Sequence, residues 1–379
     1  MKRVALVAGV VVLGAVLGAG AVLALDGARD GGSSTVAISD PPEAADPAVR
    51  SDPVLLVWTS GGLPPDLAAR VGDLASATRT TEVRGDLVEM IDPDAPDGFV
   101  VPLDALSIDA SSYASFLPKG AAETVAELAP GEAVLGTTSA QLRDARPGSI
   151  IRLATGEQVR VAAILDDALV GAAELVVPHG TLAAIDTPRF LLVAYDGPRE
   201  AIERAIRELL PPGEPVRFRA PGETPLLRHG DAVLPQAAVK VHFGEFSYRR
   251  TGERLELDPA WVREHVVEAD VPIIGVVRCH RAIVDELRAV LLELEQRNLA
   301  YLVAPDQYEG CFVPRLISPD GGVSRHAWGV ALDVNWAKNR QGETGTQDTR
   351  LIDAMTAHGF TWSGPWLVPD PAHFEWVRV

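Results

Sequence analysis

The stretch Ser324–Asn335 reads SRHAWGVALDVN, and it decides how the C-terminal part of this chain is interpreted. It contains His326 and Asp333, and the chain ends on a second run, DPAHFEWVRV, that contains Asp370 and His373. Imidazole nitrogens and carboxylate oxygens both bind Zn²⁺, and three protein ligands leave a fourth position for water. The two histidines and Asp333 are therefore candidate zinc ligands, and Asp370 is a candidate general base.

The spacing of these residues suits a sheet. His326 is expected where a loop enters a strand, Gly329 permits close backbone approach, and Asp333 lies further along the same strand. His373 is expected to open the last strand, with Glu375 on the same face, where it can orient a ligand. Spacing alone also fits solvated or hydrogen-bonded polar residues at strand ends, so both interpretations stay open on these residues.

Taken together, the stretches SRHAWGVALDVN and DPAHFEW resemble the zinc peptidases of the VanY-type D-alanyl-D-alanine carboxypeptidase and L-alanyl-D-glutamate peptidase group. Their pattern is S-x-H-x-x-G-x-A-x-D followed by D/E-x-x-H, and the positions in register here are Ser324, His326, Gly329, Ala331, Asp333, Asp370 and His373. The resemblance implies that His326, Asp333 and His373 bind zinc and that Asp370 is the general base. Many relatives carry an S-G-Y-R-S run that is missing here. Arg315, in GCFVPR, becomes the candidate for holding a substrate carboxylate or the oxyanion.

This resemblance implies an extracytoplasmic zinc peptidase that acts on the stem peptides of peptidoglycan. Two cuts remain open, D-alanyl-D-alanine carboxypeptidase trimming and L-alanyl-D-glutamate endopeptidase cleavage. A third alternative is a non-catalytic module that binds or recruits cell-wall components. The intact ligands and intact base favour an enzyme.

Residues 235–379 are predicted to form an antiparallel sheet with helices packed on it. Residues 280–298 and 347–360 have helical apolar spacing, and the aromatic runs FTWSGPW and HFEWVRV are predicted strands. LAYLVAP is predicted as a buried strand. Cys279 and Cys311 are predicted to form a disulfide in an oxidising compartment, with two buried thiols as the alternative.

Several aromatic and histidine residues near these motifs have simpler interpretations. Trp328 is predicted to line a groove, and most of the neighbouring tryptophans to pack in the core. Four histidines outside the motif are predicted to have structural or solvated roles: His179, His229, His280 and His358.

Residues 53–230 are predicted to form a separate α+β domain with a small barrel or sandwich element. Residues 135–167, LGTTSAQLRDARPGSIIRLATGEQVRVAAILDD, resemble the extracytoplasmic domain of MacB/FtsX-type permeases. That resemblance implies an interaction or positioning module without chemistry of its own, and therefore a possible protein partner.

The N-terminus contains an uncharged run, Val4 to Leu25, after Lys2 and Arg3 and before Asp26. At 1.5 Å per residue such a helix spans roughly 30 Å of hydrocarbon, and the flanking charges place the remainder outside. Residues 1–25 are therefore predicted as a single-pass membrane anchor, with a cleaved signal peptide and a secreted chain as the alternative. Residues 26–52, rich in Gly, Ser, Pro and Asp, are predicted as a flexible linker. The net charge of −18 disfavours nucleic acid as a partner.

Overall fold

The computed structural model describes residues 53–220, 223, 227–251, 254–317 and 321–378, all within one compact unit, Glu43–Val379. The predicted anchor (1–25) and linker (26–52) lie outside the described residues. Within the described part of the chain, no helix is both long enough and apolar enough to cross a membrane.

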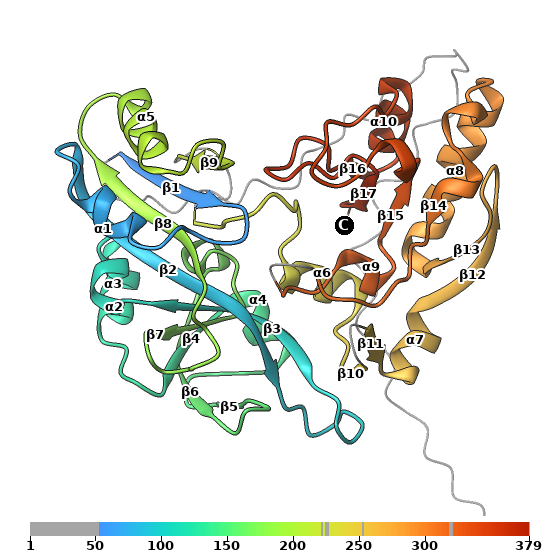
Figure 1. Cartoon of the computed structure of the whole chain (residues 1–379). Helices are drawn as coiled ribbons and strands as arrows, with labels where there is room; N and C mark the ends of the chain where they lie inside the picture. The colour runs from blue at the N-terminus through green and yellow to red at the C-terminus, as the bar shows by residue number, and fades with distance from the viewer. Residues whose placement is uncertain (1–52, 221–222, 224–226, 252–253, 318–320, 379) are drawn as a thin grey trace, which may run out of the picture. The chain divides into compact units, whose positions relative to one another are not determined.

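Residues 54–219 contribute one mixed nine-stranded sheet, in the order β5-β6-β4-β7-β3-β2-β8-β1-β9 (Figure 1). Six of these strands close into a ring, because Met90 of β2 bridges Leu153, next to β5, at the far edge of the series β2-β3-β7-β4-β6-β5. This is the small barrel element that the sequence predicted. The strands are β1 (Val54–Thr59), β2 (Ala77–Met90), β3 (Val101–Ile108), β4 (Glu132–Gly136), β5 (Ile150–Arg152), β6 (Gln158–Leu165), β7 (Leu175–Pro178), β8 (Pro188–Tyr195) and β9 (Val216–Arg219).

Both faces of this sheet are buried, as β1 illustrates. Val54, Leu56 and Trp58 pack in one apolar cluster with the helices α2 and α3. Leu55 and Val57 point to the opposite face and pack with α1 and α5. This alternation follows from the two-residue period of a strand. The helices of this region are α1 (Leu67–Gly72), α2 (Ala110–Ala114), α3 (Lys119–Ala126), α4 (Thr137–Leu142), α5 (Arg199–Leu209) and the 3₁₀ turn η1 (Asp167–Val170).

The C-terminal region is built on an antiparallel four-stranded sheet with the order β14-β15-β17-β16. The long helix α8 (Arg281–Gln296) and α10 (Thr349–Ala357) share one apolar core with this sheet, which confirms the predicted helices on a sheet. Six aliphatic side chains of α8 are buried, and each contributes about 1.5–3 kcal/mol to folding. The strands of this sheet are β14 (Tyr308–Glu309), β15 (Ala331–Val334), β16 (Phe360–Trp362) and β17 (His373–Trp376).

Two further strand pairs flank this core. The hairpin β10 (Tyr248–Thr251)–β11 (Arg254–Leu257) is followed by α7 (Pro259–His265), and then by the pair β12 (Val266–Val271)–β13 (Gly275–His280). The predicted disulfide is confirmed, because Cys279 at the end of β13 is bonded to Cys311. The bridge closes a loop of 32 residues that contains α8.

LAYLVAP is not the buried strand that its apolar sequence predicts. Asn298 takes a left-handed conformation (φ 57°) after α8, and the chain then forms the 3₁₀ turns η2 (Ala300–Leu302) and η3 (Pro305–Gln307). Tyr301 is 69% exposed, and the carbonyl of Leu302 accepts a hydrogen bond from the side chain of Asn335. The backbone groups are therefore used in turns and side-chain contacts instead of a ladder.

A buried ionic cluster joins α6 (Gln236–Phe243) to the nine-stranded sheet. The ammonium of Lys240, fully buried, lies 2.8 Å from Glu174 and 2.9 Å from Glu245. Arg143 lies 2.8 Å from the same Glu174 and 2.7 Å from Glu245. Burial raises the pKa of Glu174, but the two cations outweigh it and lower the pKa overall. The cluster therefore holds residues 236–245 against the sheet in a charge-balanced contact. The division into domains at 230–235 stays a prediction, since the described residues form one unit.

Candidate metal centre

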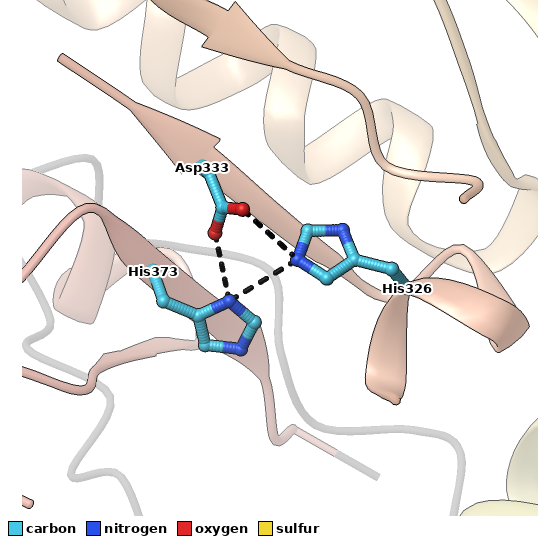
Figure 2. A group of neighbouring side chains, drawn as sticks. All are labelled: His326, Asp333 and His373. Carbon is cyan, nitrogen blue, oxygen red and sulfur yellow. Dashed lines mark hydrogen bonds and ion pairs between the residues drawn. The ribbon is translucent and has the colours of Figure 1, made fainter. Parts of the chain in front are cut away.

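His326, Asp333 and His373 come together in the C-terminal sheet, as the motif predicts (Figure 2). Asp333 on β15 is the direct cross-strand partner of His373 on β17. His326 comes from α9 (Arg325–Trp328), a single helical turn just before β15, where a loop was expected. One nitrogen of each histidine and the carboxylate of Asp333 lie within 4.8 Å of one another.

The local sequence explains how α9 presents His326. The hydroxyl of Ser324 caps the turn by accepting a hydrogen bond from the amide of His326, at 3.3 Å. Gly329 ends the turn in the left-handed region (φ 72°), where a Cβ would lie 2.8 Å from the backbone nitrogen of His280. Gly329 is therefore needed both for its backbone angle and for the close approach that the sequence predicted.

Hydrogen bonds to the outer ring nitrogens select the nitrogens that face Asp333. The Nδ1 of His326 lies 2.9 Å from the carbonyl of Gly310, so it donates there and leaves Nε2 directed inward. The Nε2 of His373 lies 3.3 Å from the carboxylate of Glu375, which leaves its Nδ1 directed inward. Glu375 therefore has the orienting position expected from the sequence.

The distances between the three inward groups suit a small tetrahedral ion. His326 Nε2 lies 3.2 Å from His373 Nδ1 and 3.3 Å from a carboxylate oxygen of Asp333, while His373 Nδ1 lies 2.8 Å from the other. Two ligand atoms about 2.1 Å from a tetrahedral zinc ion lie roughly 3.4 Å apart. The donor set of two imidazoles and one carboxylate is also a known zinc set. The residues present therefore fit zinc.

Burial and mutual contacts set the charges of this cluster. Burial raises the pKa of Asp333, but hydrogen bonds from His326 and His373 outweigh it and leave that pKa well below its usual range. Burial lowers the pKa of His373, but the carboxylates of Asp333 and Glu375 outweigh it and raise the pKa to about 10. The carboxylate at the centre of the cluster is thus held ready to bind a cation.

Asp370 lies on the turn that leads into β17, with its carbonyl accepting a hydrogen bond from the amide of His373 at 3.0 Å. Its carboxylate makes no hydrogen bond to any described side chain and lines a cavity of about 1150 Å³ together with His373 and Glu375. Burial raises its pKa. A carboxylate with these properties can accept a proton from a group in the cavity.

The loop that carries Asp370 is held by contacts that sequence patterns did not indicate. The amide of Leu367 donates to the carboxylate of Asp231 at 2.6 Å, and Arg217 on β9 donates to the carbonyl of Pro365 at 2.8 Å. Arg217 and Asp231 also form an ion pair. The loop before the predicted base is therefore tied to the edge strand of the nine-stranded sheet.

Arg315 lies at the border of two cavities. Its side chain is exposed, lines the cavity that contains Asp370, and also lines a second cavity of about 650 Å³. Its positive charge is one of the influences that lower the pKa of Asp370, although burial dominates. Arg315 is therefore near enough to the predicted base to act on the same substrate, and no described carboxylate pairs with it.

Trp328 does not line the cavity as predicted. Its ring is fully buried, packs against Phe246 with ring centroids 4.6 Å apart, and donates through Nε1 to the carbonyl of Gly244. Trp366 lines the cavity instead, with its ring centroid 5.7 Å from that of His373. The aromatic residue of the motif is thus part of the core below α9.

The other histidines are structural, with one difference from prediction. His280 caps α8 by accepting from the amide of Ala282, and His358 bonds two glutamates of α8. His179 is exposed, as expected for a turn residue, and its Nδ1 lies 2.8 Å from the hydroxyl of Ser107. His229 is not a solvated turn residue, because it stacks on a phenylalanine ring and burial lowers its pKa to about 3.

These observations define a buried His-Asp-His cluster with a carboxylate and an arginine at an adjoining cavity, the arrangement of a metallopeptidase. Residues 318–376 match the family model described as D-alanyl-D-alanine carboxypeptidase. The match confirms the resemblance carried by the motif and supports, at the level of the family, a peptidoglycan-related metallopeptidase. A search of curated proteins finds no match.

Two solved transporter domains are similar to part of the chain. The periplasmic region of MacB from Actinobacillus actinomycetemcomitans gives a TM-score of 0.31 at 11% identity, covering 44% of this chain and 87% of that one. The extracellular domain of the ABC-type transporter YknZ from Gram-positive bacteria gives 0.30 at 10% identity, covering 41% and 92%. Both are proteins of the kind that residues 135–167 resemble.

Proposed function

We propose that this chain is an extracytoplasmic zinc metallopeptidase that hydrolyses peptide bonds in peptidoglycan stem peptides, with D-alanyl-D-alanine carboxypeptidase-like activity. One observation carries the proposal. The inward nitrogens of His326 and His373 and the carboxylate of Asp333 meet within 4.8 Å, and both outer nitrogens are committed to other acceptors. Such commitment fixes the tautomers that a metal site requires.

The chain's own groups divide the remaining work. His326, Asp333 and His373 hold the zinc ion, which when bound supplies Lewis-acid polarisation of the scissile carbonyl and acidifies water. Asp370 accepts the proton of the attacking water and returns it to the leaving amine. Arg315 binds a substrate carboxylate or stabilises the developing oxyanion.

The place of action follows from the sequence. We propose that residues 4–25 anchor the chain in the cell membrane, or direct its secretion if they are cleaved, so that the peptidase region meets the cell wall. Residues 53–230 then position the peptidase or bind a protein partner.

One observation favours endopeptidase cleavage as a second candidate. A carboxypeptidase needs a pocket that closes around the terminal residue, whereas Arg315 lines two cavities and so does not mark the end of one. Such an arrangement suits a substrate that continues past the scissile bond. L-alanyl-D-glutamate cleavage is the corresponding activity.

Digestion of purified peptidoglycan by the full-length protein, followed by mass spectrometry, tests the proposal. Wild type is compared with Asp370→Asn and His326→Ala, and with the matched controls Asp353→Asn and His242→Ala, whose side chains are exposed and lie outside the cavity. Loss of a positioned general base lowers kcat by about 10²–10⁴-fold, so the first variant should release almost no product while retaining metal.

Each product pattern has a distinct meaning. Free D-alanine identifies the carboxypeptidase activity, and fragments cut after L-alanine identify the endopeptidase. If wild type releases nothing that the two site variants do not, the hydrolase proposal fails and a non-catalytic wall-binding role takes its place. Full activity in protein without stoichiometric metal would refute the zinc assignment.

A further inference from the structure

The second cavity bordered by Arg315 has a composition that points to a ligand. Its lining combines an apolar floor with three arginines, Arg254, Arg278 and Arg315. The remaining lining residues are Leu255, Leu257, Val262, Phe312, Val313 and Pro314. We call this the arginine groove.

The strands β11 and β13 and the helix α7, which contributes Val262, line the arginine groove around residues 312–315. On one side β11 runs alongside, with the amide of Leu255 donating to the carbonyl of Pro314 and an isolated bridge between Arg254 and Arg315. On the other side the amide of Phe312 donates to the carbonyl of Arg278 on β13 at 3.0 Å. The disulfide joins the residues next to this pair, Cys279 and Cys311, and so fixes their register.

The strand periodicity separates charge from apolar surface in the arginine groove. Leu255 and Leu257 are buried while Arg254 is exposed, as alternation along β11 requires. The guanidinium of Arg278 lies over the ring of Phe312, 4.7 Å from its centroid, which holds the cation at the edge of the groove. A ligand in the groove would therefore meet apolar surface below and fixed positive charge at the rim.

None of the three arginines forms an ion pair with a described carboxylate. This is unexpected in a chain with 52 acidic and 34 basic residues, where other exposed arginines are paired. Glu256, beside the groove, pairs with Arg249, and Glu268 faces Arg278 across the β12–β13 ladder without forming an ion pair. The positive charge of the groove is thus not neutralised by the described part of the protein.

We propose that the arginine groove binds a carboxylate-bearing segment of the peptide substrate beyond the scissile bond, with Arg254 and Arg278 as specificity determinants. The proposal rests on the proposed peptidase function, because Arg315 connects this groove to the cavity of Asp370 and His373. Guanidinium groups bind carboxylates through paired hydrogen bonds, and the apolar floor suits the methyl groups of small residues. The preferred substrate is therefore an acidic peptide, and amidation of its carboxylates weakens binding.

Binding to an inactive variant tests the arginine groove separately from catalysis. Full-length Asp370→Asn protein is titrated into a fluorescein-labelled stem peptide with free carboxylates, and into the same peptide with its carboxylates amidated, and the anisotropy is followed. The same titrations are made in that background with Arg254→Gln plus Arg278→Gln. The control is Arg204→Gln, an exposed arginine on α5 that lines neither cavity.

The acidic peptide should bind at least tenfold more tightly than the amidated one, and the double variant should lose most of this difference while Arg204→Gln keeps it. Thermal unfolding of each variant checks that the fold is retained, which the exposure of both arginines leads us to expect. Equal binding of the two peptides, or an unchanged difference in a folded double variant, overturns the proposal. If the acidic peptide binds more tightly but wild type hydrolyses nothing, the peptidase function is refuted and carboxylate binding by the arginine groove stands. If wild type hydrolyses peptidoglycan but binding does not depend on the carboxylates, the peptidase function stands and the proposal for the groove is refuted.

Discussion

The affinity of the cluster for metal should rise steeply with pH, because a metal ion must displace a proton from His373. The inward Nδ1 of His373 lies 2.8 Å from Asp333, and its Nε2 lies 3.3 Å from Glu375. Burial lowers the pKa of His373, but these two carboxylates outweigh it and raise the pKa to about 10. The ring is therefore protonated at neutral pH, and the proton competes with the metal.

The size of the effect follows from this competition. Below a pKa of about 10, each pH unit changes the fraction of unprotonated His373, and so the apparent metal affinity, about tenfold. Between pH 7 and pH 9 the affinity should rise about 100-fold, or ~2.7 kcal/mol. Asp333 adds nothing to this slope, because its pKa lies well below the range.

Titration of the metal-free protein with Zn²⁺ against a chromophoric chelator, calibrated at each pH, measures the slope. Calorimetry in buffers of different ionisation enthalpy measures the protons released, and about one proton per metal is expected at pH 7. Glu375→Gln removes one of the two carboxylates, so the slope should flatten first at the alkaline end. A change in affinity below threefold over this range, with no proton release, would refute the assignment of His373 as a protonated ligand.

Three further predictions concern the supports of the site. Gly329→Ala should destabilise the protein by more than about 1–2 kcal/mol in urea unfolding, because its φ is positive and the new Cβ would lie 2.8 Å from the backbone of His280. Gly342→Ala, with a positive φ but open space around it, should cost less. Lys240→Met should cost about 3–5 kcal/mol by leaving buried carboxylates unpaired, measured by the same unfolding. Asp231→Ala should lower kcat by up to about 100-fold with metal content unchanged, because it frees the loop that carries the predicted base.

The cluster of His326, Asp333 and His373 could be predicted from the sequence, through the family motif, because the arrangement of its residues is local. Ser324 and Gly329 are residues that favour the N-terminal and C-terminal ends of a helix, and they bound the single turn that carries His326. Asp333 and His373 become neighbours through one strand pair, and side chains on one face of a sheet follow a two-residue period. Cap preferences and strand periodicity of this kind can be recognised in a sequence without a structure.

The supports of the site could not be predicted in the same way. The partner of His326 is the carbonyl of Gly310, and a backbone acceptor leaves no signal in the residue type. The contact between Asp231 and Leu367 joins positions far apart in the chain, so neither residue's type or neighbours in the sequence predict the other as its partner. Trp328 illustrates the opposite error, because an aromatic residue in a motif looks functional although the turn of α9 directs it into the core.

The two histidines of the cluster are not equivalent, and their difference bears on how the site would work. His326 donates its outer proton to a neutral carbonyl, whereas the outer nitrogen of His373 faces the carboxylate of Glu375. A carboxylate acceptor increases the basicity of the imidazole it orients, so His373 should be the stronger ligand. Asp370 is linked to this same histidine through the backbone bond from the amide of His373 to its carbonyl. The proposed ligand His373 and the predicted base Asp370 are therefore positioned by one turn, so the spacing D-x-x-H suits both proposed roles, metal binding and proton transfer.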